Sequence, residues 1–293
     1  MSWLQIALTL EREQCEAAED LLLDWGALAI TLEDEADEAL LEPGPGETPL
    51  WSQLRLQALF TEDADSAAVA RALVASGYLS TPTALDIRVV ADQHWERAWM
   101  DRYQPIQCGQ RLWIYPRHWP ESDDPQRLVM RLDPGLAFGS GTHPTTGLCL
   151  GWLDNHDVSN LEVVDYGCGS GVLAIAAALC GARRVWCVDH DPQALLATVE
   201  NASYNGVADR LVTCAPEELP QGRIDLVLAN ILAGVLINLR PTLSAIPRPG
   251  GHLVMSGMLS PQTGSVRNAY AGQFDQWQRQ DRDEWSLLAA VRQ

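Results

Sequence analysis

Residues 161–171 constrain the fold of this chain more than any other segment. A short apolar run, Leu-Glu-Val-Val-Asp, leads directly into Tyr-Gly-Cys-Gly-Ser-Gly, and a helix is expected over residues 172–180. A strand, a glycine turn and a helix in this order begin a βαβ unit. Because strands and helices alternate from residue 144 onward, we predict an α/β domain with a doubly wound, parallel, Rossmann-like sheet.

The three glycines of this turn indicate a cofactor site. Gly167, Gly169 and Gly171 lack the Cβ atoms that would keep a ligand away from backbone amides at the helix N-terminus. The cofactor itself stays open on this pattern, because residues 169–174 also satisfy the GxGxxA fingerprint of dinucleotide-binding proteins. Asp165, immediately before the turn, places an anion where a cationic sulfonium and ammonium ligand fits far better than a pyrophosphate.

Two further predicted strands end in side chains that suit a cofactor. Residues 185–189 end in Asp189, whose carboxylate can accept hydrogen bonds from both ribose hydroxyls of an adenosine. Residues 224–230 end in Asn230, at the sheet edge where open α/β folds bind ligands. Pro-Gly-Gly at 249–251 is predicted to precede a strand over 252–256. Together these features favour S-adenosylmethionine as the cofactor.

The first 90 residues predict a smaller α+β domain. Leu4, Ile6, Leu8 and Leu10 alternate with other residues, as in a half-buried strand. The predicted elements are a strand at 3–10, a helix at 13–25, strands at 27–32 and 54–60, a helix at 65–76 and a strand at 85–90. This order of elements is that of ferredoxin-like domains.

Residues 91–110 are predicted to connect this domain to a larger one, which spans residues 111–293. Trp95 and Trp99 lie four residues apart, as on one face of a connector helix. We expect both tryptophans to be core residues rather than ligand contacts. Short strands near residues 112–115 and 128–132 introduce the larger domain.

Most of the negative charge lies in the first third of the chain. The whole chain carries a net charge of −19, and residues 1–100 hold 19 acidic residues against 5 arginines, a net of −14. Such a field repels nucleic acid and anionic membranes and attracts a basic partner. We therefore expect a basic protein partner, no direct nucleic-acid binding and no membrane association. An acidic surface also promotes plain solubility, and both interpretations stay open.

The cysteines and the N-terminus indicate a reducing compartment. The seven cysteines are dispersed, and no two of them have CxxC spacing, which argues against a disulfide framework and a zinc knuckle. The N-terminus lacks the basic segment and the small-residue cleavage site of an export signal. We predict a cytoplasmic protein without a bound metal.

Three longer motifs carry a resemblance to a known family. They are Asp-Pro-Gly-Leu-Ala-Phe-Gly-Ser-Gly-Thr-His-Pro-Thr-Thr at 133–146, Asp-Tyr-Gly-Cys-Gly-Ser-Gly at 165–171 and Asn-Ile-Leu-Ala-Gly at 230–234. With these motifs the chain resembles the ribosomal protein L11 methyltransferases, a family of class I S-adenosylmethionine-dependent methyltransferases. The resemblance covers essentially the whole chain, because the acidic N-terminal domain, the connector and the catalytic domain follow in that family's order.

The resemblance implies a role for each matching residue. Thr145 is expected to contact the cofactor, and Phe138, in the same loop, to help cover it. Gly167 and its neighbours are expected to hold the methionine portion, Asp189 the ribose, and Asn230 the place where the methyl donor and the acceptor amine meet. The resemblance also implies that the small N-terminal domain recognises the protein substrate.

The implied reaction transfers methyl groups to amino groups of L11, on lysine side chains, the N-terminal α-amine or both. Since the sulfonium is already an activated donor, the enzyme mainly aligns the amine with the methyl carbon and excludes water. Asn230 can hold an amine hydrogen and direct the nitrogen lone pair. Ile231 and Leu232 follow it, without the prolines and aromatic ring that clamp a planar amide or base, which favours an aliphatic amine.

Other functions stay open on the residues alone. A class I methyltransferase could act on another protein or on a small molecule. An NAD-dependent oxidoreductase would use the GxGxxA pattern and a proton-relay residue, for which only His143 lies in a suitable loop. A binding or assembly module without catalysis would tolerate the loss of Asn230. The oligomeric state is not predicted.

Overall fold

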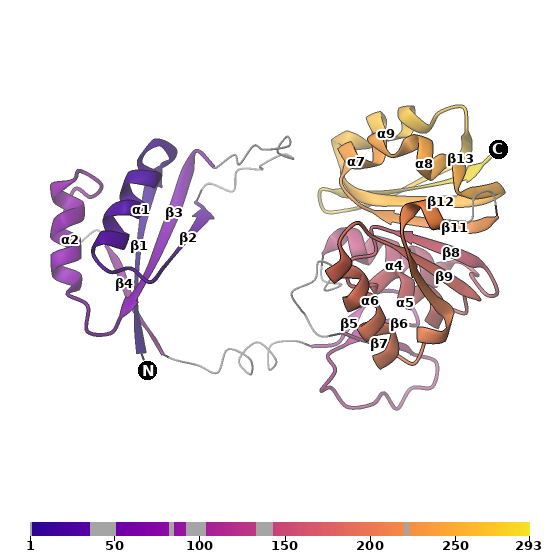
Figure 1. Ribbon diagram of the computed structural model, residues 1–293, viewed down its shortest axis with the longest axis horizontal. Helices are drawn as coiled ribbons and strands as arrows, with labels where there is room; N and C mark the ends of the chain where they lie inside the picture. Colours follow the sequence, from indigo (N-terminus) through magenta and orange to yellow (C-terminus); the bar gives the residue numbers. More distant parts are fainter. Residues whose placement is uncertain (1, 36–50, 82–84, 92–103, 133–142, 220–222) are drawn as a thin grey trace. The chain divides into compact units, whose positions relative to one another are not determined.

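The computed structural model describes residues 2–35, 51–81, 85–91, 104–132, 143–219 and 223–293. The chain divides into two compact units, residues 1–101 and 102–293 (Figure 1). Each unit has its own hydrophobic core. The predicted connector helix with Trp95 and Trp99 lies outside the described residues, and so does Phe138.

The N-terminal unit contains a four-stranded antiparallel sheet and two helices. The strands stand in the order β2-β3-β1-β4. The elements are β1 (Ser2–Glu11), α1 (Cys15–Asp24), β2 (Ala29–Asp34), β3 (Gln53–Thr61), α2 (Ser66–Ala75) and β4 (Asp86–Ala91). Their succession along the chain confirms the predicted order of strand, helix, strand, strand, helix and strand.

Alternating side chains give this sheet one apolar and one polar face. Leu8 of β1 pairs with Leu56 of β3, and both side chains are buried. Helices α1 and α2 contribute buried side chains such as Leu22 and Leu73 to the same core. The helices therefore cover the apolar face of the sheet. The helical period of about 3.6 residues and the strand period of two residues each place apolar side chains on one side of the element, and these sides pack together. Among the described residues of this unit, the polar face carries no helix.

The larger unit is built on a seven-stranded mixed sheet in the order β10-β9-β8-β11-β12-β14-β13. Its strands are β8 (Glu162–Tyr166), β9 (Arg184–Val188), β10 (Leu211–Cys214), β11 (Ile224–Asn230), β12 (Pro247–Leu259), β13 (Phe274–Arg282) and β14 (Trp285–Arg292). The prediction of a fully parallel sheet is wrong at one edge, where β14 is antiparallel to both β12 and β13. Because β13 and β14 form a hairpin, β14 follows β13 without a crossover helix and lies antiparallel between β13 and β12.

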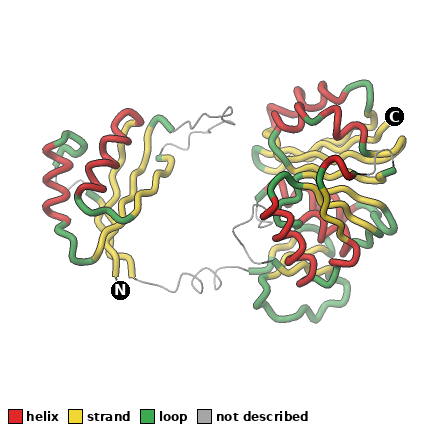
Figure 2. Tube along the Cα trace, viewed as in Figure 1, coloured by secondary structure: helices red, strands yellow, loops and turns green. Residues whose placement is uncertain are grey.

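Helices cover both faces of this sheet, as Figure 2 shows. Neighbouring residues of β8 belong to different cores: Val163 packs with one cluster and Val164 with the other. The helices on the first side are α4 (Pro144–Asn155), α5 (Val172–Leu179) and α6 (Pro192–Tyr204), and those on the second are α7 (Ala233–Asn238), α8 (Arg240–Ala245) and α9 (Thr263–Tyr270). This arrangement confirms a methyltransferase-like α/β fold in which the central strands are buried on both faces.

A small third sheet precedes the main one. It contains β5 (Ile106–Gln107), β6 (Leu112–Tyr115) and β7 (Leu128–Arg131), and the last two match the predicted short strands. Asp154 of α4 holds the β5–β6 turn, because its Oδ2 accepts hydrogen bonds from the amides of Gln110 and Arg111.

The Pro-Gly-Gly segment was predicted to lie before a strand, but it lies inside β12. A Cβ atom on Gly251 would stand 2.9 Å from the carbonyl oxygen of Arg248 and 3.0 Å from that of Ile224. The glycine is needed because two backbone segments approach each other there, at a shift in the β11–β12 register. Among the described residues, no helix has the length and apolar character needed to cross a bilayer.

We expect the larger unit to lose stability in mild acid through His252 of β12. Burial lowers the pKa of this imidazole below 6.5, and the neighbouring His156 and Arg248 lower it further. The unfolded chain therefore binds a proton more readily, and stability falls as the pH drops through about 6.5, the unfolded value. Urea unfolding of the wild type and of His252→Gln at pH 8 and pH 5.5 tests this. An equal loss of stability in both proteins would contradict it.

Candidate functional site

The predicted glycine turn follows β8, and all three of its glycines need positive φ. The angles are 79° at Gly167, 53° at Gly169 and 80° at Gly171, which other residues adopt only with strain. Val188 of β9 accepts hydrogen bonds from the amides of Gly167, at 2.7 Å, and Cys168, at 3.0 Å. The glycines therefore serve the shape of the turn first, and several of its amides already have partners within the protein.

Two glycines also allow neighbouring elements to approach the turn. A Cβ atom on Gly167 would lie 2.5 Å from Cγ2 of Ile231, which follows β11. A Cβ atom on Gly171 would lie 2.9 Å from Cγ2 of Thr198 in α6. Any larger residue at these positions would displace the end of β11 or α6, so the turn and these two elements form one packed unit.

Asp165 is the last-but-one residue of β8 and lies beneath the turn. Its side chain is 1% exposed, and its Oδ2 accepts a hydrogen bond of 2.9 Å from the amide of Ala174 in the first turn of α5. Its Oδ1 has no hydrogen-bond partner among the described residues. Burial raises the pKa of this carboxyl to about 7, and Asp189 adds to the increase. Near neutral pH this group is poised between its neutral and charged forms.

Asp189 follows β9 and bonds directly to the turn. Its Oδ2 accepts a hydrogen bond of 2.9 Å from the Gly169 amide, and its Oδ1 accepts one of 3.0 Å from the Asp191 amide. The side chain is 10% exposed. Its Oδ1 also lies 3.3 Å from Nδ1 of His190. Each carboxylate oxygen can accept two hydrogen bonds, so Oδ2 keeps capacity for a ligand hydroxyl.

Asn230 ends β11 and bonds to the start of α4. Its Nδ2 donates a hydrogen bond of 3.3 Å to Oγ1 of Thr146, whose side chain is buried. Its Oδ1 is buried and has no hydrogen-bond partner among the described residues. A buried carbonyl oxygen without a donor costs free energy, on the order of 1–3 kcal/mol, unless a ligand supplies the donor. The amide is therefore held on one side and available to a ligand on the other.

Thr145 lies in the first turn of α4 and is 3% exposed. His143 caps this helix: its Nδ1 accepts a hydrogen bond from the Thr145 amide and lies 2.7 Å from the Thr145 hydroxyl. The imidazole meets the Trp285 ring edge-on, with a centroid separation of 4.7 Å. These contacts hold Thr145 in place beside the residue that anchors Asn230.

The structure brings the described site residues together at one edge of the sheet. The central strands β9, β8 and β11 are parallel neighbours, so their carboxyl ends carry Asp189, the glycine turn and Asn230 side by side. Sequence reasoning assigned no site role to three further contact residues, Thr146, Thr198 and Ile231. They make their contacts across elements, and the only local signal is that Thr146 and Ile231 adjoin assigned residues.

The chemistry of the site suits a cationic, hydrogen-bond-donating ligand. The carboxylates of Asp165 and Asp189 and the amide oxygen of Asn230 are hydrogen-bond acceptors. In Asp165 and Asn230, the Oδ1 atom has no donor among the described residues. A pyrophosphate would meet Asp165 and Asp189 as like charges and would find the Gly169 amide occupied. Within the described residues, no group of three or more His, Cys, Asp or Glu side chains could hold a metal ion. These features fit the sulfonium and ammonium groups of S-adenosylmethionine and disfavour a dinucleotide.

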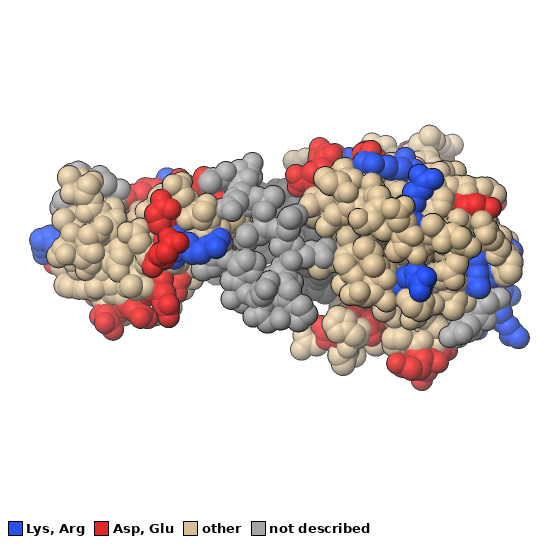
Figure 3. All heavy atoms as spheres, turned by 90° about the horizontal axis from the view of Figure 1, so that it is seen from above, with Lys and Arg blue, Asp and Glu red and all other residues tan. Residues whose placement is uncertain are grey.

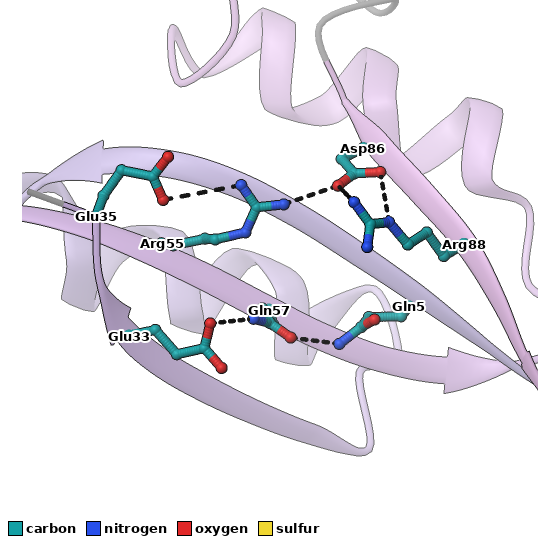
Figure 4. Close-up of polar contacts among 7 residues, drawn as sticks. All are labelled: Gln5, Glu33, Glu35, Arg55, Gln57, Asp86 and Arg88. Atoms are coloured by element: carbon teal, nitrogen blue, oxygen red, sulfur yellow. Dashed lines mark hydrogen bonds and ion pairs between the residues drawn. The ribbon is translucent and has the colours of Figure 1, made fainter.

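A hollow of about 60 Å³ lies elsewhere, on the polar face of the N-terminal sheet. In Figure 4, Arg55 bonds Asp86 at 2.7 Å and pairs with Glu35, and Arg88 also bonds Asp86. A second row joins the side chains of Glu33, Gln57 and Gln5. These charged and amide groups satisfy one another, so this face offers hydrogen-bonding surface rather than a reactive group.

Comparisons with known proteins agree with this assignment. A family model described as Ribosomal protein L11 methyltransferase (PrmA) matches residues 2–293. Curated L11 methyltransferases are similar along their whole length: the protein of Cellvibrio japonicus is 48% identical, covering 100% of this chain and 99% of that protein. The protein of Vibrio cholerae is 46% identical, covering 99% and 98%. The crystal structure of a ribosomal protein L11 methylase from Lactobacillus delbrueckii is 34% identical with a TM-score of 0.59, covering 65% of this chain and 100% of that chain.

We expect the free energy of unfolding of Asp165→Asn to increase relative to that of the wild type as the pH rises. The pKa of the wild-type carboxyl is raised to about 7, so the folded state holds a proton that the unfolded chain releases near pH 3.9. The wild type therefore loses stability between about pH 4 and 7, and the amide variant does not. Urea unfolding should favour the variant by about 1–3 kcal/mol at pH 8 relative to pH 5.

The same variant tests the charge of Asp165 in binding. Donor affinity measured by calorimetry at pH 8 should be lower in Asp165→Asn, because the anion that favours a cationic ligand is gone. Unchanged affinity in the folded variant would mean that Asp165 serves only the turn.

Asp189→Ala should weaken donor binding by roughly 2–4 kcal/mol, because it removes charge-assisted hydrogen bonds and leaves polar groups unpaired. Asp209→Ala, at an exposed acidic residue of the same unit, is the matched control. Calorimetric titration with S-adenosylmethionine measures both variants. If Asp189→Ala binds as tightly as the control while remaining folded, the placement of the ribose is wrong.

Proposed function

The chain belongs to the ribosomal protein L11 methyltransferase family, and on this premise we propose that it methylates amino groups of ribosomal protein L11. S-Adenosylmethionine supplies the methyl group on a sulfonium, which needs no metal or covalent nucleophile for activation. The acceptors are lysine side chains, the N-terminal α-amine or both. The observation that carries this proposal is the buried Oδ1 of Asn230 beside the glycine turn, for which no described residue supplies a hydrogen-bond donor.

Asn230 acts on the acceptor amine. A lysine amine near pKa 10.4 must lose a proton before it can attack, and a site that excludes water favours the neutral form. The Oδ1 atom of Asn230 then accepts one N–H of the neutral amine and orients its lone pair. The hydrogen bond from Nδ2 to Thr146 keeps the amide from rotating, so the oxygen is the atom presented to the amine.

The remaining assigned residues hold the donor. Asp189 accepts hydrogen bonds from the ribose, and the glycine turn with Asp165 accommodates the methionine portion. Thr145 contacts the donor from α4. Phe138, which lies outside the described residues, keeps the covering role that the resemblance implies. The roles of Asp189 and of the glycine turn are supported by the hydrogen bond from the Gly169 amide to Asp189, which brings the carboxylate and the turn together in one surface.

The approach to Asn230 suits an alkyl chain. Leu232, two residues further, is 50% exposed, and Val235 of α7 is 41% exposed. Exposed aliphatic side chains beside a polar amide match the four methylenes of a lysine followed by its amine. A flat base or amide would find no aromatic partner in the segment 230–235.

We infer that the N-terminal unit is a ferredoxin-like module that recognises the substrate. Residues 1–100 hold a net charge of −14, and Figure 3 shows groups of acidic side chains, with some arginine beside them, on the visible face of this unit. L11 is a ribosomal protein, and a basic partner would be attracted by this field. The polar face of the sheet adds amide and carboxylate groups for hydrogen bonding.

Mass spectrometry of L11 after incubation with the enzyme and isotope-labelled donor tests the function. The enzyme contains no lysine, so every labelled ε-amine belongs to the substrate. Label on L11 supports the proposal. Donor turnover with a small molecule or another protein, but not with L11, would favour the alternative substrates of a class I methyltransferase.

We expect Asn230→Ala to lower kcat by roughly 10- to 1000-fold while donor affinity changes little, because orientation of the amine matters only in the transition state. Asn155→Ala is the control, since the side chain of this exposed asparagine of α4 bonds to Gly151 within its own helix. Steady-state kinetics with L11 and calorimetry with donor separate the two effects. Equal turnover by both variants would remove Asn230 from the reaction.

Removal of residues 1–101 should abolish methylation of L11 and leave donor binding nearly intact, because the donor residues all lie in the second unit. In the full-length enzyme, association with L11 should slow steeply as salt rises, whereas donor affinity should hardly change. Methylation rates and donor titrations across a salt series measure both. Full activity of the shortened protein would refute the recognition role, and a salt-insensitive rate would leave solubility as the role of the acidic surface.

A further inference from the structure

One face of α6 lies directly behind the glycine turn. The helix begins after Asp191, whose side chain caps it by accepting a hydrogen bond of 2.9 Å from the Gln193 amide. Thr198 and Asn201 stand three residues apart, so they lie one turn from each other on the same side of the helix. Both side chains reach backbone carbonyl groups of the turn.

Thr198 is completely buried and makes three contacts with the turn. Its hydroxyl donates a hydrogen bond of 3.1 Å to the carbonyl oxygen of Gly169. The same hydroxyl lies 3.5 Å from Sγ of Cys168, and its Cγ2 fills the space that a side chain on Gly171 would need. The hydroxyl and the methyl group thus contact different residues of one turn.

Asn201 holds the next carbonyl group. Its Nδ2 donates a hydrogen bond of 2.9 Å to the carbonyl oxygen of Ser170, and its Oδ1 accepts one of 2.7 Å from Nη2 of Arg117. The Arg117 guanidinium also lies over the ring of Tyr204, 4.5 Å from its centroid. Asn201 is therefore fixed at both ends, with its amide group oriented toward the turn.

The same helix is joined to the other half of the donor site. The Asp191 amide, at its N-cap, donates to Oδ1 of Asp189, and Oδ2 of Asp189 accepts from Gly169. The two peptide groups that flank the Cα of Gly169 are thus both held: the Gly169 amide donates to Asp189, and the Gly169 carbonyl accepts from Thr198. Two carbonyl groups held by α6 leave the turn little freedom to rotate its peptide planes.

We propose that Thr198 and Asn201 are positioning residues of the donor site. They hold the carbonyl groups of Gly169 and Ser170 so that the glycine turn keeps the shape to which the methyl donor binds. This inference rests on the proposed function, because it assigns the turn to the donor. Neither side chain needs to touch the donor; each acts through the backbone of the turn, and its loss lowers affinity because binding must then order the turn.

Thr198→Val tests the hydroxyl, since valine keeps the branched shape and leaves the Gly169 carbonyl without its donor. We expect the Kd for S-adenosylmethionine to rise roughly 5- to 30-fold and its KM to rise in step, with kcat at saturating donor and L11 changed less than about 3-fold. Thr198→Ser restores the hydroxyl and should bring the Kd back to within about 3-fold of the wild type. If Thr198 had a purely structural role, Thr198→Val would lower the melting temperature but would not raise the KM for the donor while leaving kcat nearly unchanged.

Ser203→Ala is the matched control, because this exposed hydroxyl of α6 bonds to Val199 within its own helix. Asn201→Asp is the second variant: it keeps the acceptor for Arg117 and removes the donor to Ser170, on a side chain that is only partly buried. It should also raise the donor Kd, and it keeps the test decisive if Thr198→Val does not fold.

The outcomes separate the two levels of inference. Normal donor affinity in folded Asn201→Asp and Thr198→Val, or a Thr198→Ser variant as weak as Thr198→Val, overturns the positioning role. A wild-type protein that fails to bind S-adenosylmethionine at all overturns the proposed function instead.

Discussion

The proposed donor site depends on one hydrogen bond, from the Gly169 amide to the carboxylate of Asp189 at 2.9 Å. It joins the ends of β8 and β9, so that the turn and the carboxylate present a single surface. The loss of either partner would leave a largely buried polar group unsatisfied, at a cost of about 1–3 kcal/mol. The other contacts are arranged around this bond: α6 starts beside Asp189 and holds the carbonyl side of the turn, and Ile231 packs against Gly167 on the opposite side.

The two units treat their polar groups differently. On the N-terminal sheet, Arg55, Asp86 and Arg88 satisfy one another at the surface. In the larger unit, the carboxyl of Asp165 and the amide of Asn230 each keep a buried oxygen that no described residue satisfies. Such acceptors destabilise the protein when it is alone, and a ligand that supplies donors recovers that free energy on binding. This contrast supports the proposal that the N-terminal unit recognises the substrate and the larger unit carries the reaction.

Most of the fold was predictable from local patterns, because periodicity and glycine positions act within a few residues. The six elements of the N-terminal unit and the strand, turn and helix around residue 167 follow from such patterns. The antiparallel edge formed by β13 and β14 was missed, since it depends on which strand finally pairs with β12. The partners of the turn amides could not be predicted either: the acceptors, Val188 and Asp189, lie at the end of another strand, and no spacing rule reveals that pairing.

The sequence by itself determined the doubly wound architecture, the position of the glycine turn, and Asp189 and Asn230 as strand-end residues, because each depends on the chain's own order and local conformation. Only the tertiary structure decided which atoms of these residues are occupied and which are available. Asn230 donates from Nδ2 to Thr146, whereas its Oδ1 has no hydrogen-bond partner in the described part of the chain. Thr198 reaches the Gly169 carbonyl from a position 29 residues further along the chain. Hydrogen bonds are directional and extend only about 3 Å, so partners distant in sequence are defined only once packing has brought the strands and α6 into contact.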